Sequence, residues 1–402
     1  MCAVNMSYQK INHKLMQSNF SKDDFKVLEK FFKRANEKTI LTQGPKVKEF
    51  EKKWSKWLGV KYSTFVNSGS SANLLSLKIL KIIKKKNTNE IIVPTHTWVS
   101  DIASVIQNNF KPVFVDMDFK HLGPDNDQII SKINKKTAAV FLSHIQGFNA
   151  LSTKVINHLK KKKIHLIEDV CESHGALFKN KKLGTFGLIS NFSFYYAHHM
   201  STIEGGMIST NNREIYELSR ILRSHGMVRE IENMKIKKNY IKKYKNLSEK
   251  FIFLHDAYNM RNNEIGALLG INQLKKLDQN NKKRMDNLSF FLKNLDTSKY
   301  LTNFNVEGSS NYAFPLIIRK KSKKFSIKLE KILSKNNIEF RRGGAGGGNQ
   351  LRQPYLKKYV KNIQISKFRN VEHMHFFGYY LGNFPTLRKE KIKKICQIIN
   401  NI

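Results

Sequence analysis

The chain has 402 residues, of which 40% are apolar and 26% charged, proportions typical of a globular protein large enough for more than one domain. No apolar run is long enough to span a membrane, and the first residues do not resemble a secretory leader. The three cysteines, Cys2, Cys171 and Cys396, are too few and too widely spaced for a disulfide framework. We therefore expect a cytoplasmic protein with no membrane partner.

The charge balance is strongly basic, because 72 lysines and arginines face 31 aspartates and glutamates and give a formal net charge of +41. Such a balance often accompanies binding to nucleic acid or to a membrane surface. Here the cations are mostly lysines spread along most of the chain, and no basic arm or arginine-rich helix stands out. We therefore expect a solvated lysine-rich surface and no nucleic-acid partner, although the excess charge can help attract an anionic substrate.

Through the first half of the chain, short apolar strands alternate with helical segments. An amphipathic helix is expected at 45–59, where Gly59 can end it. The expected strands are 63–67, 91–94, 111–116, 137–145 and 163–169, with helices after the first strand, at 97–108 and at 153–162. This alternation predicts an α/β fold with a mostly parallel sheet covered on both faces, and it places binding groups at the carboxyl ends of the strands.

The second half continues the pattern and then changes character. A strand at 207–210 and a helix at 212–226 are followed by a very lysine-rich stretch at 228–250, which we expect to be a surface insertion. A further helix is expected within 258–278. We expect a large α/β domain over 1–289 and a small C-terminal α+β domain over 290–402, which contains the glycine-rich stretch 341–355.

Two places at the predicted strand ends can hold a charged ligand. Ser68, Gly69 and Ser70 form a small-residue turn before a helix, where free backbone N–H groups suit one phosphate, although an ordinary capping turn has the same residues. Asp169 ends an apolar strand, so its carboxylate needs a partner. That partner can be a protonated pyridine nitrogen, with Trp98 offering an aromatic face. A helix cap or an arginine partner for Asp169, and core packing for Trp98, are the alternatives.

The segment 191–207, NFSFYYAHHMSTIEGGM, resembles a stretch of the DegT/DnrJ/EryC1/StrS family of sugar aminotransferases. In that family the pattern S-F-x-x-x-K…E-G-G carries the lysine that forms a Schiff base with pyridoxal phosphate. Ser193 and Glu204-Gly205-Gly206 match the pattern, but His198 stands at the lysine position. The segments 66–75, 93–106, 167–187 and 258–278 also resemble family motifs, so that the similarity covers nearly the whole chain.

The resemblance implies a fold-type-I, pyridoxal-phosphate-dependent aminotransferase fold in a homodimer. It also implies that pyridoxal 5'-phosphate or pyridoxamine 5'-phosphate is the cofactor. The implied cofactor-binding residues are Ser68, Gly69, Ser70, Trp98, Asp169, Glu172, Ser193 and, toward the partner subunit's cofactor, Asn259. Glu172 stands where many members have glutamine.

The change from lysine to histidine resembles the branch that removes the C3 hydroxyl of a GDP-linked 4-keto-6-deoxyhexose in deoxysugar and lipopolysaccharide biosynthesis. Imidazole cannot form a stable imine, so the cofactor would be held noncovalently. An imidazole titrates near neutral pH and can act as a base. The spacing favours His198 over His199, and the resemblance implies glutamate as amino donor. A related branch with an iron–sulfur cluster is disfavoured by the scattered cysteines.

Two other functions stay open, namely a sugar aminotransferase that tolerates the missing lysine and a non-catalytic basic binding module. The module would be expected to have lost the cofactor residues, which still stand in this sequence. His225, Arg342 and Arg352 are candidate substrate contacts, and Arg341 flanks the same glycine-rich stretch. An exposed position at a helix end is the alternative for His225, and surface solvation is an equal alternative for the arginines. His373 and His375 have no third ligand nearby in the sequence, so we expect no metal site.

Overall fold

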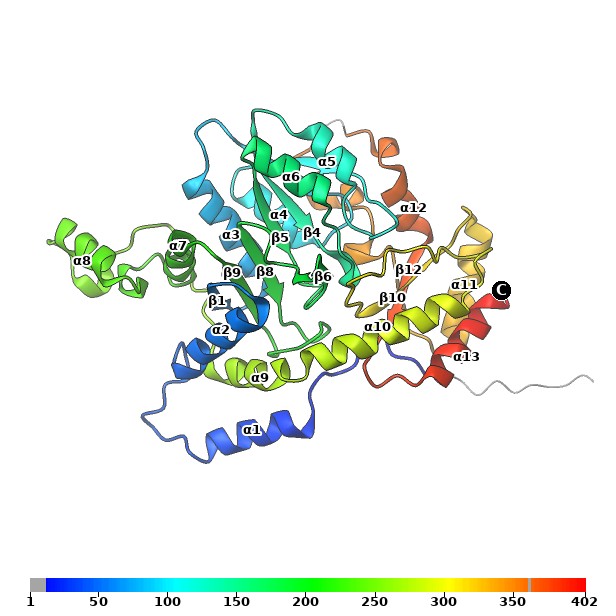
Figure 1. Cartoon of the computed structure of the whole chain (residues 1–402), viewed down its shortest axis with the longest axis horizontal. Coiled ribbons are helices and arrows are strands. Elements are labelled where there is room, and N and C mark those ends of the chain that lie inside the picture. The colour runs from blue at the N-terminus through cyan, green and yellow to red at the C-terminus, as the bar shows by residue number, and fades with distance from the viewer. Residues whose placement is uncertain (1–11, 361–362) are drawn as a thin grey trace, which may run out of the picture.

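A computed structural model describes residues 12–360 and 363–402, and its centre is a seven-stranded sheet (Figure 1). The strand order is β1-β9-β8-β5-β4-β2-β3. The chain of pairings from β3 through β2, β4 and β5 to β8 is parallel, and β9 runs antiparallel to both of its neighbours. The mostly parallel α/β sheet is therefore confirmed. The strands are β1 Tyr62–Val66, β2 Glu90–Pro94, β3 Lys111–Val115, β4 Thr137–Ser143, β5 His165–Asp169, β8 Ile189–Ser193 and β9 Gly206–Thr210.

Helices cover both faces of this sheet, because neighbouring residues of each strand point in opposite directions. In β2, Ile92 packs in one apolar cluster with α2, α6 and α9, whereas Ile91 and Val93 pack in another with α3 and α4. The helices of the sheet layers are α2 Pro45–Leu58, α3 Gly69–Ile83, α4 Val99–Gln107, α5 Asn126–Lys132, α6 Thr153–Lys162, α7 Arg213–Arg223 and α9 Glu264–Leu274. The helix expected at 45–59 ends as predicted, because Gly59 adopts φ +92° at its C-cap.

A second, smaller sheet lies in the C-terminal part, in the antiparallel order β10-β12-β11. Its strands are β10 Ala313–Ile317, β11 Phe340–Arg342 and β12 Gly378–Gly382, and its helices are α10 Leu277–Asn294, α11 Lys323–Lys335, α12 Arg369–Phe377 and α13 Lys389–Asn400. The predicted boundary between residues 289 and 290 falls inside α10. The segment around His13 also joins this part, because the buried imidazole Nε2 bonds to the Gly382 carbonyl at 3.0 Å.

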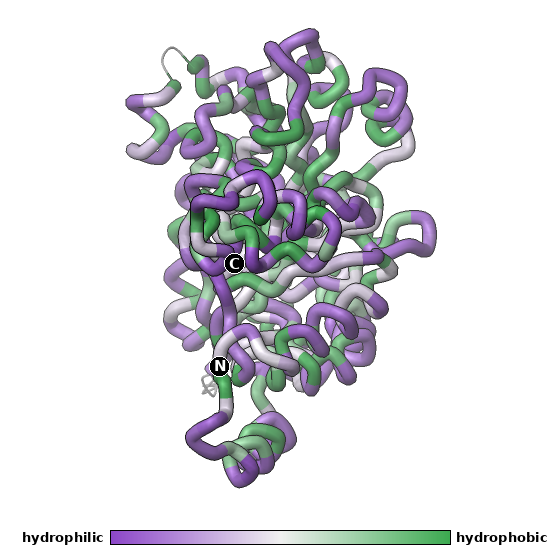
Figure 2. The backbone as a smooth tube through the Cα atoms, turned by 90° about the vertical axis from the view of Figure 1, so that its left-hand side faces the viewer, coloured by the Kyte–Doolittle hydropathy of each residue, from purple (hydrophilic) through white to green (hydrophobic). Residues whose placement is uncertain are grey.

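Two further elements lie at the periphery. Helix α1, Lys22–Phe32, packs against α9 below the body of the molecule. It lies at the lower end of the ribbon in Figure 1 and of the tube in Figure 2. Figure 2 shows hydrophobic and hydrophilic residues mixed along it. A short hairpin, β6 Leu177–Phe178 and β7 Lys181–Lys182, follows β5.

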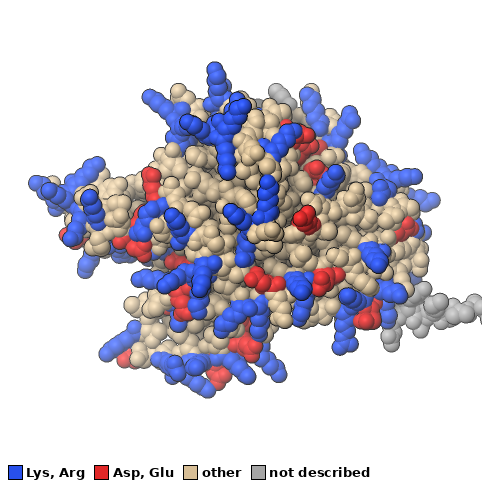
Figure 3. All heavy atoms as spheres, viewed as in Figure 1, with Lys and Arg blue, Asp and Glu red and all other residues tan. Residues whose placement is uncertain are grey.

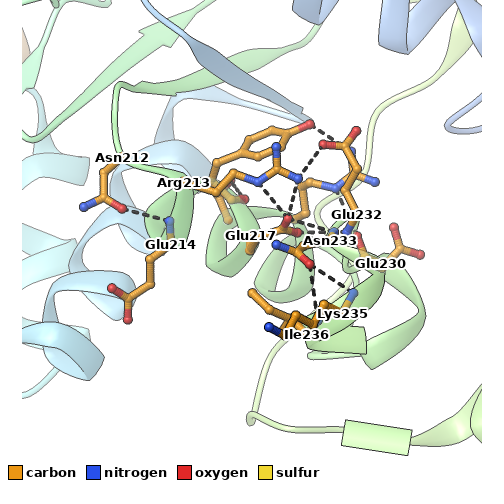
Figure 4. Close-up of polar contacts among 12 residues, drawn as sticks. Asn212, Arg213, Glu214, Glu217, Glu230, Glu232, Asn233, Lys235 and Ile236 are labelled. Atoms are coloured by element: carbon orange, nitrogen blue, oxygen red, sulfur yellow. Dashed lines mark hydrogen bonds and ion pairs between the residues drawn. The ribbon is translucent and has the colours of Figure 1, made fainter. Parts of the chain in front are cut away.

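The lysine-rich stretch 228–250 begins with the buried Val228 and Ile231 and then forms α8, Met234–Lys243, which has no buried residue and projects away from the sheet beyond α7 (Figure 1). It is therefore the surface insertion that the sequence predicts. Its base is held by Glu217 of α7, whose carboxylate accepts backbone N–H groups of Glu232 and Asn233 and pairs with Arg213 at 2.8 Å (Figure 4). Asn233 then caps α8.

Lysine and arginine side chains are spread over the whole face drawn in Figure 3 and do not gather in one patch there. Acidic side chains lie among them. Of the helices in residues 12–360 and 363–402, none is both long and apolar enough to cross a membrane.

Candidate active site

A cavity of about 430 Å³ opens at the carboxyl ends of the parallel strands. Ser143 and Asp169, the last residues of β4 and β5, form part of its floor, and the start of α3 forms one wall. Eight predicted site residues line it, namely Ser68, Gly69, Ser70, Trp98, Asp169, Glu172, Ser193 and His198. They come from four separate stretches of sequence, which the parallel topology brings to one edge of the sheet.

The turn before α3 presents donors to this cavity. The first intrahelical bond runs from Ala72 N–H to the Ser68 carbonyl, so the N–H groups of Gly69 and Ser70 precede it. The Ser68 side chain caps the helix by accepting from Ser71 N–H at 3.0 Å. With the helix dipole behind them, these groups form a site for one anion.

Glycines allow this turn to lie close to its neighbours. A Cβ on Gly69 would lie 2.5 Å from the Ser193 Cβ, and one on Gly206 would lie 2.2 Å from the Ser68 carbonyl oxygen. Either methyl group would push the turn away from β8 or β9. The E-G-G motif therefore contributes close backbone packing beside the anion site.

Asp169 lies at the end of β5 and is 6% exposed. One carboxylate oxygen accepts the Cys171 backbone N–H at 2.8 Å, and the other accepts from Asn73 Nδ2 at 2.8 Å. The same Asn73 nitrogen also donates to the carboxylate of Asp101 at 2.8 Å. Two carboxyl groups therefore meet at one amide.

Trp98 immediately precedes α4 and is 49% exposed at the cavity. This exposure is unusual for an indole that packs in a core. The side chain is free to cover a planar ring that enters the cavity.

The two histidines of the tandem have different surroundings. His198 lines the cavity, and its Nδ1 has no hydrogen-bond partner. His199 is 2% exposed, and its Nε2 bonds to the Ser310 backbone carbonyl. Burial lowers the pKa of His198 to about 4, although the charge of Asp169 acts in the opposite direction. His198 is therefore a neutral imidazole at pH 7.

A third imidazole lies behind this pair. The ring centroid of His174 is 5.1 Å from that of His199 and 6.1 Å from that of His198. Burial and the two neighbouring imidazoles lower the pKa of His174 well below its usual value, so this cluster also stays uncharged.

Glu172 and the neighbouring Tyr312 form another wall of the cavity. The Glu172 carboxylate accepts the Gln146 backbone N–H at 2.8 Å. Burial raises the pKa of Glu172 to about 7, with a further contribution from Asp169. It also raises the pKa of the neighbouring Tyr312 hydroxyl. The wall therefore offers a phenol and a carboxyl group that titrates near neutral pH.

The DegT/DnrJ/EryC1/StrS aminotransferase family model matches residues 24–400 of this chain. The chain belongs to this family. A relative from Escherichia coli O55:H7, GDP-4-keto-6-deoxy-D-mannose 3-dehydratase, is 32% identical over 97% of this chain and 100% of its own length.

Two solved structures agree with the family fold. The E. coli GDP-4-keto-6-deoxy-D-mannose-3-dehydratase with bound hydrated PLP is 30% identical, has a TM-score of 0.86 and covers 97% of this chain and 100% of its own. A GDP-4-keto-6-deoxymannose-3-dehydratase with a trapped PLP-glutamate geminal diamine is 29% identical, has a TM-score of 0.84 and covers 96% of this chain and 100% of its own. The predicted family and the predicted aminotransferase fold are confirmed.

The side chains of this DegT/DnrJ/EryC1/StrS member fit the family's cofactor. The free N–H groups at Gly69 and Ser70 suit its phosphate, and Trp98 offers a face to its ring. The buried Asp169 carboxylate suits a protonated ring nitrogen, and His198, whose Nδ1 has no hydrogen-bond partner, lines the same cavity. This donor set matches a phosphorylated pyridine.

The remaining predicted residues lie elsewhere. Arg352 pairs with Glu372 at 2.6 Å, and Arg342 lies 3.7 Å from Glu330. His225 follows α7 with φ +58°, and Asn259 is exposed in the stretch before α9. None of these four is among the described residues that line the cavity.

One arginine beside the glycine-rich stretch and several residues without a sequence signal also line the cavity. Arg341, at the centre of β11, lines the cavity in place of Arg342. Because side chains alternate along a strand, the two arginines face opposite sides of the small sheet. The other lining residues that the sequence did not single out include Leu15, Met16, Thr97, Asp101, Ser143, Tyr195, Tyr312 and Tyr380.

Proposed function

We propose that this protein is a pyridoxamine-phosphate-dependent 3-dehydratase, which replaces the C3 hydroxyl of a nucleotide-linked 4-keto-6-deoxyhexose by hydrogen. GDP is the favoured nucleotide, because the relative named above acts on a GDP sugar. The observation that carries the proposal is the neutral imidazole of His198 at the cavity, in the sequence position where aminotransferases of this family carry lysine.

The overall reaction balances without an external reductant. The sugar loses its C3 hydroxyl and gains one hydrogen, a net loss of one oxygen atom, while glutamate becomes 2-oxoglutarate and releases ammonia. The water formed from the C3 hydroxyl is balanced by the water consumed when the amino group is released as ammonia, so no net water is formed. Glutamate is therefore the source of the two electrons.

The cofactor supplies an amine for the C4 keto group and an aromatic ring that withdraws electrons. Asp169 would hold the ring nitrogen in its protonated state by its negative charge. Ser68, Gly69, Ser70 and Ser193 would bind the phosphate, and Trp98 would cover the ring.

His198 would move the protons. Because its imidazole is neutral at pH 7, it can accept a proton from the reacting carbon of the cofactor. The imidazolium can then deliver this proton to the oxygen that leaves C3. An imidazole cannot make the covalent tether of a lysine, so the cavity residues would hold the cofactor by noncovalent contacts alone.

His199 is assigned a different task. Its Nε2 bonds to the backbone of Ser310, which precedes the wall residue Tyr312. We propose that His199 holds the backbone that places Tyr312 in the cavity wall. Arg341, exposed beside the Tyr380 hydroxyl at 3.4 Å, is a candidate for the substrate diphosphate or for the glutamate carboxylate.

We also propose a homodimer in the cytoplasm, in which Asn259 reaches the partner's cofactor. This assignment is supported by the exposure of Asn259 outside its own cavity and by large exposed apolar side chains nearby, including Phe253 and Tyr258. Tyr258→Glu should shift the molecular mass in solution toward that of the monomer, which light scattering measures.

A sugar aminotransferase is the second candidate, because the family's named activity is amino transfer. The two functions differ in their product. A dehydratase releases ammonia and a 3-deoxy sugar, whereas an aminotransferase retains nitrogen on the sugar.

The test of His198 is a comparison of two adjacent variants. Protein supplied with pyridoxal phosphate, glutamate and GDP-4-keto-6-deoxymannose is expected to release ammonia. His198→Asn should lower this rate by about 10²–10⁴-fold, as loss of a general base does. His199→Asn serves as the control and should retain more of the rate. If His198→Asn keeps its rate while His199→Asn loses it, the assignment of the base is wrong.

A further inference from the structure

A second carboxyl group lies beside the one expected to face the cofactor ring. Asp101, in the first turn of α4, is 1% exposed, and Asp169 is 6% exposed. Asn73 Nδ2 donates to both side chains at 2.8 Å. Two carboxylates this close and this buried repel each other strongly if both are ionised.

Within the part of the chain that the structure describes, no cation pairs with either carboxyl group. Among the ion pairs of residues 12–360 and 363–402, none includes Asp101 or Asp169. The titratable groups that act on the pair are the Cys171 thiol, Glu172, the Tyr355 phenol and His198. Burial and the neighbouring carboxyl groups raise the pKa of Cys171, and burial raises that of Tyr355, so both stay neutral at pH 7.

The hydrogen bonds around Asp101 also require one more proton than the neighbouring hydroxyl groups supply. The Thr97 hydroxyl and the Ser143 hydroxyl both lie within hydrogen-bond distance of Asp101 Oδ2, and they lie 2.8 Å from each other. These three contacts need three protons, but the two hydroxyls supply only two. A proton on Asp101 Oδ2 would complete the ring of three hydrogen bonds.

Burial and the charge of Asp169 raise the pKa of Asp101 well above its usual value, which agrees with this count. The two hydroxyl donors act in the opposite direction but are the smaller causes.

We propose that Asp101 is a positioning residue that carries a proton at neutral pH and thereby keeps Asp169 as the only ionised member of the pair. The neutral acid removes the repulsion between the two side chains and, through Thr97, Ser143 and Asn73, fixes the carboxylate that would meet the ring nitrogen. This role rests on the proposed contact of Asp169 with the cofactor.

The protonation state can be measured without the cofactor. The infrared spectrum of the cofactor-free protein at about pH 8, above the pKa of about 7 of Glu172, should contain a carboxylic-acid band that Asp101→Asn removes. Asp127→Asn, at an exposed aspartate of α5, is the matched control and should leave the band unchanged. If Asp101→Asn removes no acid band, Asp101 is ionised and the proposal fails.

Cofactor binding then tests the positioning. Asparagine resembles a protonated aspartate, so Asp101→Asn should bind pyridoxal phosphate within about threefold of the original affinity. Asp101→Ala should weaken binding about tenfold, because it removes the acceptor of one hydroxyl and of Asn73 and the proton that completes the ring. A folded Asp101→Asn variant with more than tenfold weaker binding would show that the charge of Asp101 is needed and would overturn the proposal.

A pH profile separates this role from a purely structural one. In the original protein, affinity for pyridoxal phosphate should fall as the pH rises through the pKa of Asp101, and in Asp101→Asn this fall should be absent. An identical fall in both proteins would contradict the proposal. Neither the band nor the binding profile depends on deoxygenation, so failure of the proposed function would leave these results intact.

Discussion

Two clusters of carboxyl groups in this protein are stabilised in opposite ways. At the base of the insertion, Glu217 and Glu232 share the guanidinium of Arg213 (Figure 4). In the cavity, Asp101 and Asp169 accept from amide, hydroxyl and backbone donors, and neither has a cationic partner among residues 12–360 and 363–402. The chain has 72 basic residues, yet the Asp101–Asp169 pair has no cationic partner among the described residues. We therefore expect its negative charge to be neutralised by a proton and by a cationic ligand.

A third site in the molecule has a carboxylate that is both buried and paired with a cation. Glu51 accepts a hydrogen bond from Arg223 Nη1 at 2.6 Å, and their side chains are 7% and 2% exposed. Arg223→Met should therefore reduce the free energy of unfolding by about 3–5 kcal/mol, because it leaves a buried carboxylate without its partner. Chemical denaturation measures this loss, and Arg229→Met at a more exposed pair is the control. Equal losses in both variants would contradict it.

Acid should weaken the protein through buried neutral imidazoles. His96 can donate from Nδ1 to the Leu122 carbonyl at 2.9 Å while its Nε2 accepts from Ala345 N–H at 3.1 Å, so it must be neutral. Burial lowers its pKa from 6.5 to about 4. The unfolded chain then binds the proton first, and stability present above pH 6.5 is lost as the pH falls toward 4.

For His96 alone this loss is about 3 kcal/mol, at about 1.4 kcal/mol per pKa unit. His96→Gln should flatten the decrease in unfolding free energy between these pH values, which urea denaturation at several pH values measures. The control is His158→Gln on α6. An unchanged slope in His96→Gln would contradict the neutral assignment.

Asp169→Asn should weaken pyridoxal-phosphate binding by about 10–100-fold, which corresponds to about 1.5–3 kcal/mol for a charged hydrogen bond. The same substitution at Asp101 should change binding little, so the two neighbours differ although both are buried. Fluorescence titration with the cofactor measures both affinities. Equal losses at the two positions would mean that the carboxyl groups have the same state.

The smallest effect is expected at the insertion. Arg213 is 41% exposed, so Arg213→Gln should cost about 1 kcal/mol or less of unfolding free energy. Thermal unfolding measures it, with Lys154→Gln at another exposed pair as control. A loss as large as that of Arg223→Met would show that the exposure of the arginine does not determine how much an ion pair contributes to stability.

The elements that the sequence predicted well have strong periodicity. Residues 91–94 of β2 form a continuous apolar run, and α2 carries apolar residues at helical spacing. The strand β8, Ile189–Ser193, was missed because it contains serine and asparagine at buried positions. These polar groups find partners only in the folded chain, as when Ser76 Oγ donates to Asn191 at 2.7 Å.

The site follows the same rule. Residues in continuous motifs, such as the 68–70 turn and His198, could be placed in the cavity from the sequence. Asp101 could not, because its partners come from α3, β4 and β5 and meet only when the sheet forms. The sequence could not decide between Arg341 and Arg342, because the phase of the short strand β11 cannot be read from a glycine-rich stretch.

Mass spectrometry of the sugar product tests the proposed chemistry most directly. The purified protein, supplied with glutamate, pyridoxal phosphate and GDP-4-keto-6-deoxymannose, should yield a GDP sugar with one oxygen fewer and one equivalent of ammonia. A GDP sugar that has gained nitrogen, with no ammonia released, would contradict deoxygenation and identify an aminotransferase.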